Sequence, residues 1–190
     1  MGYPNRKSVN MSISRTQLIV LLCLFLFIVA TFSLVFYIKD KNARQEQDQA
    51  AQIFSSNPDN PTYTDIYGNP VALENFLGSA VVATTWASWS PFSASDLTKL
   101  SALAQEFSGQ EVVFLGVNRK ETKQRAQQYM ATLEAFPDIK LVIDSEDKFY
   151  TMVGGYAMPE TVVFNKVGEI VLHLRGELDV AAVRAVLEGQ

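Results

Sequence analysis

The chain has 190 residues, 48% hydrophobic and 19% charged, so it can bury the core of one domain with apolar sequence left over. Sixteen basic and twenty acidic residues give a net charge of -4. This charge argues against nucleic acid as a partner, because the chain has no excess of cationic side chains to neutralise phosphates. A single cysteine, Cys23, and a single histidine, His173, exclude an intrachain disulfide and a cysteine-built zinc site.

The first expected element is a membrane anchor. Residues 18–38 carry no charge and, at helical rise, would span about 30 Å, the thickness of a hydrocarbon core. The run is longer than the apolar part of a signal peptide and has no good cleavage site. We therefore predict an N-terminal segment at 1–17 and one uncleaved transmembrane helix at 18–38 that contacts membrane lipid. Basic residues flank the run equally on both sides, so charge alone does not orient it.

A linker is expected between the anchor and the rest of the chain, at residues 39–61. Its first part is rich in glutamine and alanine and can continue the helix out of the membrane. The serines, asparagines and prolines of residues 55–61 then stop the helix. The remaining residues, 62–190, are predicted to form one domain.

Hydrophobic periodicity predicts strands and helices in alternation from residue 80 onward. Short β-branched runs and a later hairpin pattern indicate strands at 80–85, 112–117, 141–143, 161–164 and 169–174. Helical spacing indicates helices at 93–107 and 122–133, one that Asp144 caps with Asp147 three residues later, and one from Asp179 to Leu187. This order requires parallel crossovers followed by an antiparallel hairpin, so we predict an α/β sandwich with a mixed sheet.

An aromatic motif follows the first buried strand: Trp86-Ala87-Ser88-Trp89-Ser90-Pro91-Phe92-Ser93. With the order of the elements, it resembles the thioredoxin fold, and more narrowly the membrane-anchored redoxins related to proteins that reduce apocytochrome thiols in cytochrome c maturation. Residues 65–76 and 155–161 fit the same family, the latter matching its loop with a cis-proline. Over residues 62–190 the resemblance implies a thioredoxin-like three-layer sandwich. It also implies a single-pass cell-membrane protein with a cytoplasmic N-terminus and an extracytoplasmic domain.

Both redox positions of this family carry serine here. The family motif is Trp-Cys-x-x-Cys, and Ser90 and Ser93 stand where its cysteines would be. In active relatives one thiolate attacks a disulfide and the second thiol resolves the mixed disulfide. A serine hydroxyl can perform neither step, and residues 39–190 contain no cysteine. We therefore expect no catalytic residue and no autonomous exchange, which leaves an enzymatic role open but disfavoured; the serines are expected to cap and begin the helix at 93–107.

Two other uses of these side chains are disfavoured. A hydrolytic nucleophile at Ser90 would need a base, yet His173 alternates with Leu172 and Leu174 in a predicted hairpin strand and is expected to face solvent or an edge. We expect no metal site, because the sole histidine has no thiol beside it, and no cofactor.

What the resemblance leaves is a binding groove. Pro159 is expected in cis, which would free the backbone of Met158 to pair with an extended peptide. Trp89, Phe92 and Met158 would flank the groove with adaptable apolar side chains, although packing alone would also explain the two aromatic residues. We predict that the groove binds a peptide or protein client. The alternative is an accessory role in a thiol-disulfide oxidoreductase system, for cytochrome maturation or envelope redox, in which a partner supplies the thiols.

Overall fold

The structure is a computed structural model that describes residues 15–56 and 63–189. The chain separates into two compact units, Met1–Gln45 and Glu46–Gln190. Most of the predicted N-terminal segment and the predicted stop of the linker helix after Ser56 lie outside the described residues. The boundaries proposed for the four segments of the chain therefore remain predictions.

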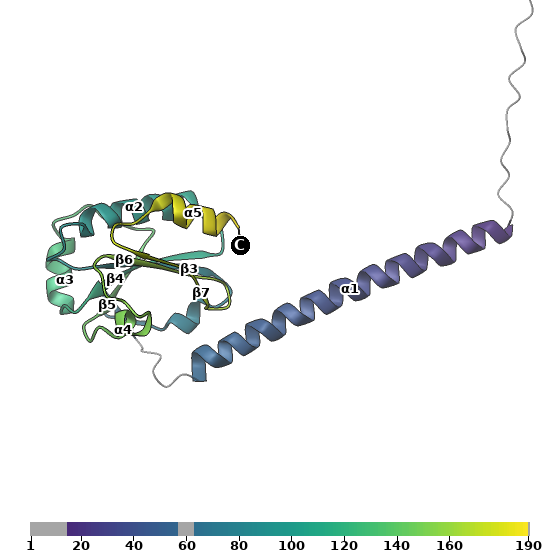
Figure 1. The fold of residues 1–190 in the computed structure, drawn as a ribbon, viewed down its shortest axis with the longest axis horizontal. Coiled ribbons are helices and arrows are strands. Elements are labelled where there is room, and N and C mark those ends of the chain that lie inside the picture. The colour runs from purple at the N-terminus through teal and green to yellow at the C-terminus, as the bar shows by residue number, and fades with distance from the viewer. Residues whose placement is uncertain (1–14, 57–62, 190) are drawn as a thin grey trace, which may run out of the picture. The chain divides into compact units, whose positions relative to one another are not determined.

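The first described element is one long helix, α1, which runs from Arg15 to Ser56 (Figure 1). Within the described residues, its part Arg15–Ile38 is the one stretch that is long and apolar enough to cross a membrane. Large apolar side chains such as Phe32 and Phe36 are exposed along it, as expected for a helix that needs an apolar surrounding on all sides. The helix continues beyond this stretch, as the glutamine- and alanine-rich sequence predicts.

The second unit is built on one seven-stranded sheet with the order β2-β1-β5-β4-β3-β6-β7. Its strands are β1 (Tyr63–Asp65), β2 (Pro70–Val71), β3 (Ala80–Trp86), β4 (Val112–Arg119), β5 (Lys140–Asp144), β6 (Glu160–Phe164) and β7 (Ile170–Arg175). The central strands β3, β4 and β5 are parallel, whereas β1, β6 and β7 join antiparallel. The predicted mixed sheet is confirmed, with three parallel strands from the alternating units and an antiparallel hairpin at one edge.

Helices cover both faces of this sheet, which gives the three predicted layers. They are the short 3-10 helix η1 (Leu73–Phe76), α2 (Ser93–Glu106), α3 (Lys123–Met130), α4 (Lys148–Met152) and α5 (Val180–Glu188). Figure 1 shows α2 and α5 on one face and α4 on the other. Beneath α2 and α5, Leu100, Leu103 and Val183 pack with sheet residues such as Val82 and Val163.

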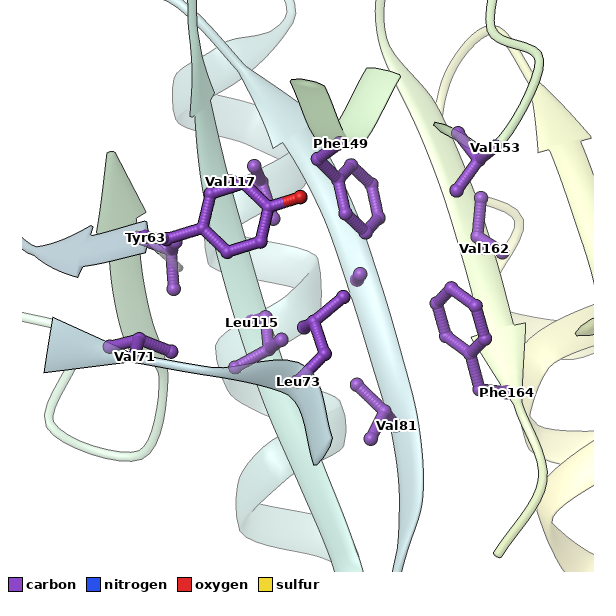
Figure 2. Close-up of a cluster of buried hydrophobic side chains, with 12 residues drawn as sticks. Tyr63, Val71, Leu73, Val81, Leu115, Val117, Phe149, Val153, Val162 and Phe164 are labelled. Carbon is purple, nitrogen blue, oxygen red and sulfur yellow. The ribbon is translucent and has the colours of Figure 1, made fainter. Parts of the chain in front are cut away.

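A second buried cluster fills the face that carries α4 (Figure 2). There Phe149 lies between Tyr63 and Phe164, with ring centroids 6.5 and 6.4 Å away in edge-on geometry. Val162 and Phe164 of β6 belong to this cluster and Val163 to the other, as the period of two in a strand requires. Side chains at positions 160, 162 and 164 therefore share the α4 face.

Helix ends are where the sequence predictions need correction. The helix after β5 begins only at Lys148; Asp144 still accepts from the N–H groups of Lys148 and Phe149, at 2.9 Å each, but from the end of the strand. Asp147 has a left-handed backbone, with φ of 62°, and its carboxylate pairs with Arg119. The predicted helix at 122–133 ends at Met130. The predicted cap at Asp179 is confirmed by its bond from the N–H of Ala182, at 3.0 Å.

Candidate functional site

The predicted site residues come from two segments that leave the sheet at one edge. β3 ends at Trp86, and β6, its antiparallel neighbour, begins at Glu160. The hydroxyl of Thr85 joins the two strand ends: it accepts from the Glu160 N–H at 2.8 Å and donates to the Glu160 carbonyl at 3.2 Å. The motif segment after β3, residues 87–93, and the loop before β6, residues 154–159, therefore emerge side by side.

Ser93 is the first residue of α2, as predicted, but its hydroxyl does not cap the helix. The side chain is fully buried and turns back to Ala87, accepting from its N–H at 3.0 Å and donating to its carbonyl at 2.8 Å. The N-cap position is held by Phe92, without a side-chain bond. The predicted capping role is thus wrong, because the hydroxyl is needed to close the motif turn.

Ser90 is the second serine of the motif and is used differently. Only 4% of its surface is exposed, and its hydroxyl has no hydrogen-bond partner among the described residues. Its backbone shapes the turn: the N–H donates to Ala87 at 3.1 Å and the carbonyl accepts from Ser93 at 3.3 Å. The predicted cap is therefore wrong for Ser90 as well, and no base contacts its hydroxyl.

A buried carboxylate just after β4, which the sequence did not reveal, braces the motif segment. Glu121 accepts from the backbone N–H of Ser88 at 2.8 Å, the Ser88 hydroxyl at 2.5 Å, Asn118 Nδ2 at 2.8 Å and Arg125 Nε at 2.9 Å. Burial disfavours its charge, but the bonds from Ser88 and Asn118 outweigh burial and hold the pKa of Glu121 below the usual glutamate range. The motif segment is thereby fixed to the end of β4.

The loop before β6 is held by a second buried carboxylate. The Met158–Pro159 peptide bond is cis. Glu160 is fully buried; its Oε1 accepts from the N–H groups of Tyr156 at 2.8 Å and Ala157 at 2.6 Å, while Oε2 lies 2.6 Å from Nε2 of His173.

Further hydrogen bonds hold the same loop from α4 and from the turn after β7. The hydroxyl of Tyr150 donates to the Ala157 carbonyl at 2.8 Å. The N–H of Gly176 donates to the Pro159 carbonyl at 2.9 Å. The backbone on both sides of Met158 is therefore fixed.

His173 corrects another sequence expectation. It lies on the edge strand β7, as predicted, but its side chain is only 15% exposed and pairs with Glu160 instead of facing solvent. The pairing follows from the register: Glu160 and Val162 share the α4 face, and His173 is the cross-strand partner of Val162. The histidine is thus bonded away from Ser90, which argues further against a hydrolytic pair.

The apolar residues of the predicted groove divide into exposed and buried members. Trp89 is 56% exposed and Phe92 40% exposed, so part of each aromatic surface is open to a partner. Met158 is half-buried, Pro159 is buried, and Trp86 is fully buried and stacks on Tyr129 with centroids 5.8 Å apart. We call Trp89, Phe92, Met158 and Pro159 the motif surface.

A cavity of about 870 Å³ lies elsewhere, between residues 65–67, α3, the loop after it and the beginnings of β4 and β5. It includes none of the predicted site residues. Across residues 15–56 and 63–189, no group of three or more histidine, cysteine or acidic side chains could hold a metal ion.

Known proteins give the fold a context. A family model described as the AhpC/TSA family matches residues 48–173, and no curated protein sequence matches the chain. The exposed lipoprotein thioredoxin Etrx1 of Streptococcus pneumoniae is 18% identical, with a TM-score of 0.62, covering 68% of this chain and 98% of its own. A putative thiol:disulfide interchange protein DsbE of Chlorobium tepidum has the same identity and TM-score, covering 68% and 91%. StoA of Bacillus subtilis is 18% identical, with a TM-score of 0.54, covering 66% and 93%. At such identity these structures establish the thioredoxin-like fold that the sequence predicts.

Proposed function

We propose a binding role for this chain, which belongs to the AhpC/TSA family. Ser90 and Ser93 would stand at the two cysteine positions of the Trp-Cys-x-x-Cys motif that the sequence resembles. In this proposal it is a membrane-tethered, extracytoplasmic thioredoxin-fold protein that binds a peptide or protein client at the motif surface. It has no redox chemistry of its own. The observation that carries the proposal is the pair of exposed aromatic side chains, Trp89 and Phe92, beside two serines that cannot act on a disulfide.

The loss of redox chemistry follows from the properties of oxygen and sulfur. A thiolate at a helix N-terminus attacks a disulfide because its pKa is low enough for ionisation near neutral pH. A hydroxyl such as that of Ser90 stays protonated there, and Ser93 has its hydroxyl bonded to Ala87. Since residues 39–190 contain no cysteine, no other thiol of the domain could replace them.

The energetics of the proposed contact require the apolar side chains. Two hydrogen bonds from a client strand to Met158 would contribute about 1–3 kcal/mol in total. Millimolar binding already needs about 4 kcal/mol, so most of the affinity must come from burial of groups such as Trp89 and Phe92. Burying an aromatic side chain supplies a free energy of that order, about 2–3 kcal/mol.

The location is proposed from α1. Its stretch Arg15–Ile38 is suited to a single membrane crossing, and the resemblance to anchored redoxins supports a cytoplasmic N-terminus with the domain on the other side. This topology would present the motif surface to polypeptides of the extracytoplasmic space.

A second candidate is an accessory role in a thiol-disulfide oxidoreductase system. It is favoured by the neighbouring structures, which include a thioredoxin and a putative thiol:disulfide interchange protein. In that case the motif surface would hold a client or an active partner while the partner supplies the thiols. Client reduction by an active thioredoxin-like protein would then be faster when this chain is added, whereas a pure binding role gives no acceleration.

Binding to an unfolded, thiol-free probe tests the proposal. The full chain in nanodiscs is titrated with fluorescently labelled, reduced and S-carbamidomethylated α-lactalbumin. Trp89→Ala and Met158→Ala should each weaken binding on the order of tenfold, because each removes apolar contact area. Tyr67→Ala is the matched control, since Tyr67 is a more exposed aromatic residue outside the motif surface. Equal binding by all four proteins would refute the proposal.

A further inference from the structure

Glu160 is a fully buried acid directly after the cis-proline, at the first position of β6. Its carboxylate accepts from the N–H groups of Tyr156 and Ala157 on Oε1, and its Oε2 lies 2.6 Å from Nε2 of His173, which donates to it when that nitrogen carries a hydrogen. Tyr156 and Ala157 come immediately before Met158, whose backbone is the proposed pairing site. One buried side chain thus sets the shape of the loop that a client would contact.

The charge of Glu160 matters for this geometry. An ionised carboxylate only accepts hydrogen bonds, so it suits three converging donors. A protonated carboxyl carries a hydrogen on one oxygen. Unless the other tautomer of His173 accepts this hydrogen, a buried N–H of the loop or the histidine is left without an acceptor. The loop before Met158 is therefore compatible with the ionised form.

We infer that Glu160 is a positioning residue for the motif surface: its ionised carboxylate holds Tyr156 and Ala157 so that Met158 can pair with a client, and His173 completes the set of donors. The inference rests on the proposed function for its consequence, client binding. The hydrogen bonds by which Glu160 holds the loop are observed in the structure and do not depend on that proposal.

The other charged and titratable groups around Glu160 lie on α4, β4 and β7. Tyr150 of α4 donates to Ala157, and the Arg119 guanidinium of β4 lies 3.3 Å from the centre of its ring while pairing with Asp147. Arg175 of β7 lies over the ring of Tyr156, 4.5 Å from its centre. Among these neighbouring groups, the imidazole of His173 contacts the Glu160 carboxylate directly.

The direction of the pH response follows from these contacts. Burial disfavours the charge, but the bonds from Ala157, Tyr156 and His173 outweigh burial and hold the pKa of Glu160 below the usual glutamate range. A carboxyl whose pKa is lower in the folded state contributes stability above its unfolded pKa and loses it as the pH falls through the folded value. The loop is thus held at neutral pH and released in acid.

Two substitutions separate the effect of the Glu160 charge from the effect of its hydrogen-bonding geometry. Glu160→Gln keeps an oxygen that can accept from Tyr156 and Ala157, and its amide can donate to the other tautomer of His173. It cannot titrate, so the acid response should vanish while the loop stays held. His173→Leu leaves Oε2 without its donor, so the acid release should move up by about one pH unit.

The first measurement needs no client. Hydrogen–deuterium exchange of residues 154–158 is followed in the full chain in nanodiscs at matched pH. Relative to Glu160→Gln, the wild type should lose protection on the order of tenfold between about pH 7 and about pH 2, because the pKa of Glu160 lies below the usual glutamate range. Identical protection in wild type and Glu160→Gln across this range would overturn the inference.

The second measurement adds the S-carbamidomethylated α-lactalbumin probe. Wild-type affinity should fall on the order of tenfold in acid, whereas Glu160→Gln should change by less than about twofold. A response of the loop without binding at any pH overturns the proposed function but leaves the role of Glu160 standing. Binding with the same pH dependence in both proteins, without a response of the loop, overturns the role of Glu160 and leaves the function standing.

Discussion

The two segments that form the motif surface use their polar groups in opposite ways. In the motif segment, the hydroxyl of Ser90 has no partner within the described chain, and that of Ser93 serves only to close the turn at Ala87. In the loop before β6, by contrast, the backbone of Ala157 and the carbonyl of Pro159 are all bonded. The motif segment contains no thiol, whereas the loop is held by hydrogen bonds on both sides of Met158.

The largest expected effect comes from placing thiols at both serine positions of the motif segment. Ser90→Cys/Ser93→Cys should gain disulfide reductase activity on insulin in the presence of dithiothreitol, on the order of tenfold or more above the wild type, because a thiol at the N-terminus of α2 would ionise and attack. All variants carry Cys23→Ala, so that only the introduced thiols react. Ser90→Cys alone should instead accumulate a mixed disulfide. An inactive but well-folded double variant would mean that the motif segment has lost more than its sulfur atoms.

A smaller effect should separate the two serines. Ser93→Ala leaves the buried N–H and carbonyl of Ala87 without the hydroxyl, so the free energy of unfolding should fall by about 1–3 kcal/mol. Ser90→Ala removes a buried hydroxyl that has no partner among the described residues, so it should leave this free energy unchanged or raise it by about 1 kcal/mol. Urea unfolding of the full chain in detergent, followed by tryptophan fluorescence, measures both. Similar losses in the two variants would contradict the different roles assigned to these hydroxyls.

The fold was accessible from the sequence because its signals are local. The β-branched run of β3 and the spacing of Leu97, Leu100 and Leu103 in α2 specify a buried strand and an amphipathic helix without any knowledge of their neighbours. α3 was harder, since its sequence is mostly polar and only Ala126 is buried, so its last turn could not be predicted from periodicity.

The candidate site was accessible only in part, for a physical reason. Ser90 and Ser93 belong to one short motif, and Pro159 belongs to a second short pattern at residues 155–161, so both can be recognised along the chain. Glu160 and His173 meet only through the pairing of β6 with β7, which puts both on the α4 face. Glu121 likewise becomes buried through contact with Ser88, which lies far from it in sequence. Charged residues are usually exposed, so residue type alone favoured solvent for all three.

The most direct test of recognition without redox chemistry uses one client in two forms. The Cys23→Ala full chain in nanodiscs is titrated in one buffer with α-lactalbumin whose disulfides are scrambled, so that it cannot refold, and with its S-carbamidomethylated form, and released thiols are measured in each titration. The account predicts affinities within about threefold of each other, because neither form meets a thiol, and no thiol released. Binding that requires the disulfides, together with their reduction, would contradict it.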